Sequence, residues 1–185
     1  TGNYNTAFGV NALFANTTGS NSTAIGYRAL MANTAIGSTA VGSEALTSNT
    51  TGTENTAVGI RALKLNTTGI NNTAIGSDVL TNNTTGNYNV GLGSLSLKFN
   101  TTGGNNVAVG FYALISNSTG VSNVGVGYRS LTGNTTGGYN VGVGQQTLTA
   151  NSTGASNTAI GHTSMISNTE GSNNVAIGYE TLYSN

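Results

Sequence analysis

The sequence predicts an all-β protein, a parallel β-solenoid in which the chain winds into short coils stacked along one axis. Three observations support this fold class. A block close to Asn-Thr-Ala-Ile-Gly recurs every 17 residues, and Gly and Asn return at fixed places in each copy. A 17-residue unit is too short for two packed helices, and short runs of Thr, Val and Ile favour strands. A fixed period of this kind is typical of solenoids. Residues 1–185 are therefore expected to form a single repeat array.

Each coil is numbered from the residue that opens its block, which is called position 1. The coils begin at Asn5, Ser22, Ser38, Asn55, Asn72, Asn89, Asn106, Asn123, Asn140, Asn157 and Asn174. Successive starts are 17 residues apart, except for a step of 16 between Ser22 and Ser38. Residues 33–37 of that short coil replace a longer Asn-Thr-Thr-Gly segment, so the deletion is expected in a turn. At the spacing of paired strands, eleven coils predict a rod of roughly 50 Å.

Glycine and leucine mark the corners and the core of the expected coil. Position 5 is Gly in every copy, and position 15 is Gly in nearly all of them, which predicts two corners and two short strands per coil. Position 4 is always apolar, and position 9 is Leu except at Met165. We expect positions 4 and 9, such as Val58 and Leu63, to form a thin core.

Position 3 holds only Ala or Gly. Its residues are Ala7, Ala24, Ala40, Ala57, Ala74, Gly91, Ala108, Gly125, Gly142, Ala159 and Ala176. Side chains alternate along a strand, so position 3 points away from positions 2 and 4. A solvent-facing position would include polar residues among eleven copies. We therefore predict that position 3 faces another chain, because a core this small gains from burying a second face by cyclic self-association.

Position 12 is Asn in every coil. Its residues are Asn16, Asn33, Asn49, Asn66, Asn83, Asn100, Asn117, Asn134, Asn151, Asn168 and Asn185. Stacked Asn side chains can hydrogen-bond along an array of parallel strands, so position 12, and also position 1, predict Asn ladders. Some of these residues match the N-glycosylation pattern, as in Asn49-Thr50-Thr51. A structural Asn-Thr-Thr-Gly turn produces the same match.

Composition excludes several classes of function. Charged residues make up 5% of the chain and the net charge is zero. Five basic residues spread over 185 positions cannot supply the phosphate contacts of a nucleic-acid-binding protein. The apolar runs are shorter than the ~18–20 residues of a membrane span, so no membrane insertion is expected. The chain starts without Met or a signal peptide, and we expect it to be a segment of a longer fibre.

The sequence offers few groups for catalysis. His162 is the single His, and the chain has no Cys for a catalytic triad or a zinc site. Glu170 and Glu180 do not form a recognisable glycosidase pair. His162 occupies a variable position and is interpreted as an exposed side chain. We expect no enzyme activity, no cofactor and no metal.

Three surface patterns suggest further hypotheses. Position 7 reads Arg28, Glu44, Arg61 and Asp78 in successive coils, so opposite charges would alternate up one solvated face. Aromatic residues at variable positions suggest either a carbohydrate-stacking surface or ordinary surface packing. They are Tyr27, Tyr88, Phe111, Tyr112, Tyr128, Tyr139 and Tyr179. The paired Thr residues of the turns would form rows, such as those through Thr67 and Thr68, which suggests ice binding.

The repeat resembles known fibre repeats. Residues 72–76 (Asn-Thr-Ala-Ile-Gly) and 174–178 (Asn-Val-Ala-Ile-Gly) are similar to the head repeats of YadA-like trimeric autotransporter adhesins. The longer unit, with Ala-Leu and Asn-Thr-Thr-Gly, resembles repeats of phage tail fibres and bacterial surface fibres that often end in an endosialidase-type chaperone domain. The resemblance implies a left-handed β-roll, three chains wound about one axis, and a role in attachment or spacing. The adhesin unit is shorter than 17 residues.

These observations predict a structural, non-enzymatic fibre segment that serves as the shaft or head of an adhesive fibre. The expected location is extracellular, on a cell surface or a virion. The expected partners are further copies of the chain, in a homotrimer or stacked end to end, and a host-surface glycan or protein. Two alternatives remain open, a head-to-tail polymerising extracellular filament and an ice-binding solenoid.

Overall fold

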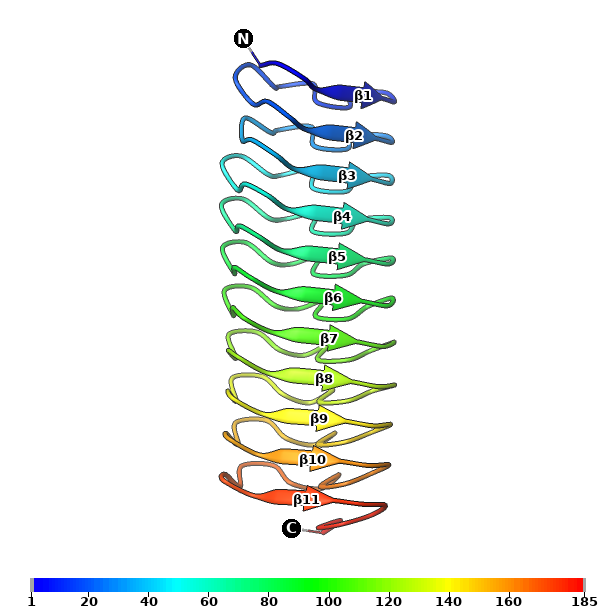
Figure 1. Ribbon diagram of the computed structural model, residues 1–185, viewed down its shortest axis with the longest axis vertical. Helices are drawn as coiled ribbons and strands as arrows, with labels where there is room; N and C mark the ends of the chain where they lie inside the picture. The colour runs from blue at the N-terminus through cyan, green and yellow to red at the C-terminus, as the bar shows by residue number, and fades with distance from the viewer. Residues whose placement is uncertain (1, 185) are drawn as a thin grey trace.

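The computed structural model describes residues 2–184 as one straight stack of coils (Figure 1). Each coil contributes one strand of three residues, and the described residues contain no helix. The strands are β1 (Thr6–Phe8), β2 (Thr23–Ile25), β3 (Thr39–Val41), β4 (Thr56–Val58), β5 (Thr73–Ile75), β6 (Val90–Leu92), β7 (Val107–Val109), β8 (Val124–Val126), β9 (Val141–Val143), β10 (Thr158–Ile160) and β11 (Val175–Ile177). The predicted all-β parallel solenoid is confirmed.

The strands form a single parallel sheet in the order β1 to β11. Equivalent positions pair between neighbouring coils, as in Thr56 with Thr73 and Ala57 with Ala74. Any side chain therefore lies directly above its counterpart in the previous coil. This in-register stacking turns a pattern in the sequence into a column of like residues on the surface or in the interior.

The short coil keeps this register. Thr23 still pairs with Thr39, so the deletion leaves the strands unchanged. Asn33 donates to the carbonyl of Ala35 as Asn49 does to that of Gly52, which places Ala35 at position 15. The missing residue is therefore the one at position 14, in a turn, as the sequence predicted.

The prediction of two strands per coil is wrong. Positions 2 to 4 are extended, and the rest of the coil consists of turns. Gly at position 5 has φ between 105° and 138°, a backbone conformation that residues other than Gly rarely adopt. Positions 7 and 9 then adopt left-handed backbone, as in Arg61 (φ 56°) and Leu63 (φ 51°). This alternation curls the segment tightly and leaves no second run of extended residues.

The interior of the solenoid is formed by positions 3, 8 and 9. Ala57, Ala62 and Leu63 are all fully buried within one chain, and the equivalent residues of other coils join them in a single core. Val58 at position 4 lies on the outside and is 36% exposed. The prediction that positions 4 and 9 form the core is therefore correct for position 9 and wrong for position 4.

The predicted inter-chain role of position 3 is also wrong. Between coils 2 and 11 these residues are buried inside their own chain, and Ala7 is exposed in a coil that has a neighbour on one side only. The residues for which this inter-chain role was predicted are Ala7, Ala24, Ala40, Ala57, Ala74, Gly91, Ala108, Gly125, Gly142, Ala159 and Ala176. Position 3 does point away from positions 2 and 4, as predicted, but the residues on both faces of the strand are apolar, so the sequence did not show which face is inside. The interior takes the small side chains because Leu at position 9 already fills it.

Interior packing accounts for Gly91 and Gly142 at position 3. Val79 is larger than the Ala found at position 8 in most early coils, and a Cβ on Gly91 in the next coil would collide with Val79 Cγ1. A Cβ on Gly142 would lie 2.7 Å from Ser130 Oγ and 2.8 Å from Thr147 Oγ1. At these two places, extra volume at position 8 is offset by Gly at position 3, as expected for a close-packed core.

Candidate functional site

Two columns of buried Asn side chains run along the rod. At position 12, the Nδ2 group of each Asn donates to Oδ1 of the Asn one coil earlier, at 2.8–2.9 Å, from Asn33 to Asn168. The same Nδ2 group also donates to the position-15 carbonyl of its own coil, as in Asn66 to Gly69. The predicted ladder is confirmed between Asn33 and Asn168. Asn16 instead bonds to Gly19, and Asn185 lies outside the described residues.

Position 1 forms a second ladder from Asn55 to Asn174. The backbone N–H of Asn72 donates to Asn55 Oδ1 at 2.9 Å, and Asn72 Nδ2 donates to the carbonyl of Gly86 at 2.8 Å. Gly86 also accepts from Asn83 of the position-12 ladder at 2.9 Å. Both ladders therefore converge on the position-15 carbonyl. A Cβ there would lie against the neighbouring Gly and Asn oxygens, and this contact explains the Gly.

Burial of the position-12 Asn side chains decides whether they can be glycosylated. Asn49, Asn66 and Asn134 are fully buried, and the Nδ2 group of each donates two hydrogen bonds. In the folded chain these amides cannot accept a glycan. The Asn-x-Thr pattern at these three positions is therefore explained by the turn.

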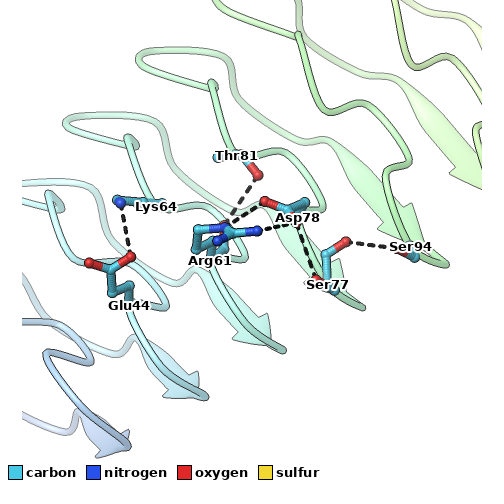
Figure 2. A network of polar contacts seen from close by, with 7 residues as sticks. All are labelled: Glu44, Arg61, Lys64, Ser77, Asp78, Thr81 and Ser94. Carbon is cyan, nitrogen blue, oxygen red and sulfur yellow. Dashed lines mark hydrogen bonds and ion pairs between the residues drawn. The ribbon is translucent and has the colours of Figure 1, made fainter.

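The charged residues at position 7 pair only in part as predicted. Arg61 donates two hydrogen bonds of 2.7 and 2.8 Å to Asp78 of the next coil, whereas Glu44 pairs with Lys64 at 2.9 Å (Figure 2). The hydrogen bond from Arg61 holds the pKa of Asp78 below its usual value, and the bond from Lys64 does the same for Glu44. Arg28 instead lies over the ring of Tyr27 at 5.0 Å.

The outer face of the sheet is an apolar strip formed by positions 2 and 4. Position 2 is Thr or Val throughout. Position 4 points outward and carries Phe8, Ile25, Val41, Val58, Ile75, Leu92, Val109, Val126, Val143, Ile160 and Ile177. Ile75 is 40% exposed, and the aliphatic residues Val58 and Leu92 flank it in the neighbouring coils. This surface was not predicted from the sequence, because position 4 was expected to lie in the core. The signal was present, since position 4 is apolar in every coil.

Aromatic side chains gather on the turn that follows the sheet. Phe111 and Tyr128 occupy position 6 in successive coils, with ring centroids 6.1 Å apart and planes within 9°. Tyr112 meets Phe111 edge to face at 4.2 Å. Arg129 lies 5.7 Å from the Tyr112 ring and 5.5 Å from the Tyr128 ring.

Other predicted aromatic residues are more dispersed. His162 is exposed, as expected, and stacks on Tyr179 at 5.4 Å. A hydrogen bond to Glu180 raises the pKa of Tyr179. Tyr88 and Tyr139 occupy position 17, where they are 54% and 64% exposed.

The two Thr rows of the turns differ in their contacts. At position 13 the hydroxyl of Thr67 donates to the carbonyl of Thr84 in the next coil at 3.0 Å, and other coils repeat this bond. Thr68 at position 14 is exposed. One of the two rows is thus used to join coils, and one faces solvent.

Among residues 2–184, no three His, Cys, Asp or Glu side chains are grouped to hold a metal ion. The same part of the chain contains no helix that is long and apolar enough to cross a membrane. Comparison with protein-family models, curated proteins and solved structures found no match to this chain.

Proposed function

We propose that the chain is a structural, non-enzymatic segment of an adhesive fibre on a cell surface or a virion. In this proposal the copies associate through the outer face of the sheet. The observation that carries it is position 4, which points outward and is apolar in all eleven coils. Other outward positions, such as 6 and 17, vary between polar and apolar residues.

The strip is continuous along the rod, because positions 2 and 4 follow all eleven strands of the sheet. A standard interface buries roughly 800 Å² on each partner. Positions 2 and 4 contain no charged residue, so burying them leaves no unpaired charge. Large contiguous apolar patches on soluble proteins usually mark interaction sites.

A second copy of the chain fits the strip for geometric reasons. It has the same coil spacing, so its side chains at position 4 match the period of the first copy along the whole rod. Cyclic symmetry would close the assembly, and the repeat resemblance favours three chains. The ladders described above stiffen each rod, which suits a shaft or spacer.

Replacing Ile75 and Val109 by Lys tests this association. The double variant is expected to sediment as a monomer of 18.5 kDa, whereas the unmodified chain is expected at three times that mass. Both sites are on the surface, so each coil should still fold. Leu65→Lys with Val121→Lys is the matched control, because these exposed apolar residues lie outside the strip and should leave assembly unchanged.

Two results would overturn the proposal. A stable 18.5 kDa monomer of the unmodified chain would contradict association. Unaltered assembly of the Ile75→Lys, Val109→Lys variant would show that the strip is not the interface. Rods of indefinite length in electron microscopy would instead favour a head-to-tail filament.

A further inference from the structure

We propose that the turn edge formed by Phe111, Tyr112, Tyr128 and Arg129 binds a saccharide chain that carries carboxylates. This inference rests on the adhesive part of the proposed function, because it names the class of ligand that the fibre would hold. It concerns positions 6 and 7 and leaves the outer strip free for association.

The aromatic rings form a platform of the kind that packs against sugars. Phe111 and Tyr128 are 44% and 43% exposed although they stack nearly parallel across two coils. Tyr112 holds Phe111 from the side at 4.2 Å. The C–H groups on one face of a pyranose ring are weakly positive, and the face of an aromatic ring is negative, so the two attract in addition to burying apolar area.

Arg129 accounts for the preference for a saccharide that carries carboxylates. The Tyr112 and Tyr128 rings hold its guanidinium group in place from 5.7 and 5.5 Å. Among residues 2–184 no carboxylate forms an ion pair with Arg129, whereas Arg61 is occupied by Asp78. The guanidinium group presents a planar set of N–H donors that matches a carboxylate.

The surrounding sequence strengthens this preference. Between Asp78 and Glu170 the chain contains no acidic residue, and its two charged side chains are Lys98 and Arg129. The middle of the rod therefore carries a positive potential that would attract an anionic ligand and has no nearby carboxylate to repel it.

The edge continues beyond the cluster, which favours a chain over a single sugar. Position 6 carries Gln145 and His162 in the next two coils, followed by Tyr179. His162 and Tyr179 are again nearly parallel, with planes within 13°. From Phe111 to Tyr179 the edge spans four coil steps, or about 19 Å at the spacing of paired strands. Flat side chains thus recur once per coil along this edge.

Titration with defined oligosaccharides tests the site on the assembled protein. The probes are hexagalacturonate, the neutral cellohexaose and a six-residue single-stranded thymidine oligonucleotide, each measured by calorimetry. Hexagalacturonate is expected to bind at least tenfold more tightly than cellohexaose. The preference for hexagalacturonate should fall sharply at high salt, because Arg129, the partner of the ligand carboxylate, is exposed to solvent.

Three variants locate the site. Arg129→Gln is expected to remove the preference for hexagalacturonate over cellohexaose. Tyr128→Ser is expected to weaken the binding of both oligosaccharides by at least tenfold. Tyr139→Ser removes a more exposed aromatic residue at position 17 and should leave binding unchanged. Arg129 is exposed, so Arg129→Gln keeps the test valid even if Tyr128→Ser unfolds the turn.

The outcomes separate this inference from the proposed function. No binding of hexagalacturonate, equal binding of the oligonucleotide, or an equal loss in Tyr139→Ser would overturn the saccharide site. If the assembled mass is retained while hexagalacturonate does not bind, the inference alone fails. If the chain is a monomer and still binds through Arg129, the association fails and the saccharide site stands.

Discussion

At the scale of single residues, small side chains and amides determine how the coils stack. Ala57 occupies an interior that Leu63 has already filled, and one more carbon atom at such a place has nowhere to go. Asn66 joins its coil to the previous one and also to its own turn. Both effects repeat in each coil, so the contribution of one residue is best measured in the middle of the rod.

Gly91→Ala is predicted to lower the free energy of unfolding by roughly 1–3 kcal/mol, the usual cost of overpacking a core. The new Cβ would collide with Val79 Cγ1. Val79→Ala removes the colliding atoms, so the double variant should recover part of the loss. Thermal unfolding of the two single variants and the double variant measures the coupling. Purely additive effects would contradict the predicted contact.

Asn100→Ala is predicted to cost about 2–4 kcal/mol, because it leaves buried polar groups without partners at ~1–3 kcal/mol each. Asn117 Nδ2 loses one of its two acceptors, and Asn83 Oδ1 loses its donor. Asn82→Ala is the matched control, since Asn82 lies one position before a ladder residue and is half-buried. Chemical denaturation should separate the two variants. Similar losses in both would argue against the ladder as the cause.

At the scale of structural elements, each coil is a three-residue strand followed by a long turn held by left-handed residues. Leu63 has φ 51°, an unfavourable backbone for a Leu, and its full burial offsets that cost. The turns also carry the charged pairs between coils, as in Arg61 with Asp78 (Figure 2). The turns rather than the strands therefore differ most from coil to coil.

The charged pairs predict a change of stability with pH. The pKa of Asp78 and that of Glu44 are lowered from ordinary values of 3.8 and 4.5. Each carboxylate therefore stabilises the fold above its ordinary pKa, and this contribution is lost as the pH falls through the lower folded value. The melting temperature should drop below about pH 4. The drop should be smaller than the effect of Gly91→Ala, because exposed ion pairs contribute little.

A paired variant isolates this effect. Asp78→Asn with Glu44→Gln should have a lower melting temperature at pH 7 and a flatter decline toward pH 3. An unchanged pH profile in the variant would assign the acid sensitivity to other groups. Sodium chloride at high concentration should reduce the difference at pH 7, because the partner Arg61 is exposed to solvent.

At the scale of the whole molecule, period and composition were enough to predict the rod, the number of coils and the Asn columns. They could not tell which face of the strand is inside. Ala57 and Val58 are both apolar, and alternation alone says only that they point apart. The decision depends on interior volume, which Leu63 and its neighbours set in three dimensions. The sequence suggested a stacking surface of aromatic residues but not their grouping with Arg129, because the curled turn that gathers Phe111, Tyr128 and Arg129 was predicted to be a strand.

The contact between Val79 and Gly91 has a consequence for how such a rod can change its length during evolution. The junctions between the first five coils have Ala at position 8 on one side and Ala at position 3 on the other, so a gene could lose or duplicate one unit there and still encode a well-packed chain. Loss of residues 89–105 would instead bring Ala108 against Val79, with the same collision that Gly91 avoids. The length of the rod can therefore change in steps of one coil, about 4.8 Å, but at some junctions the residues at positions 8 and 3 of neighbouring coils must change together.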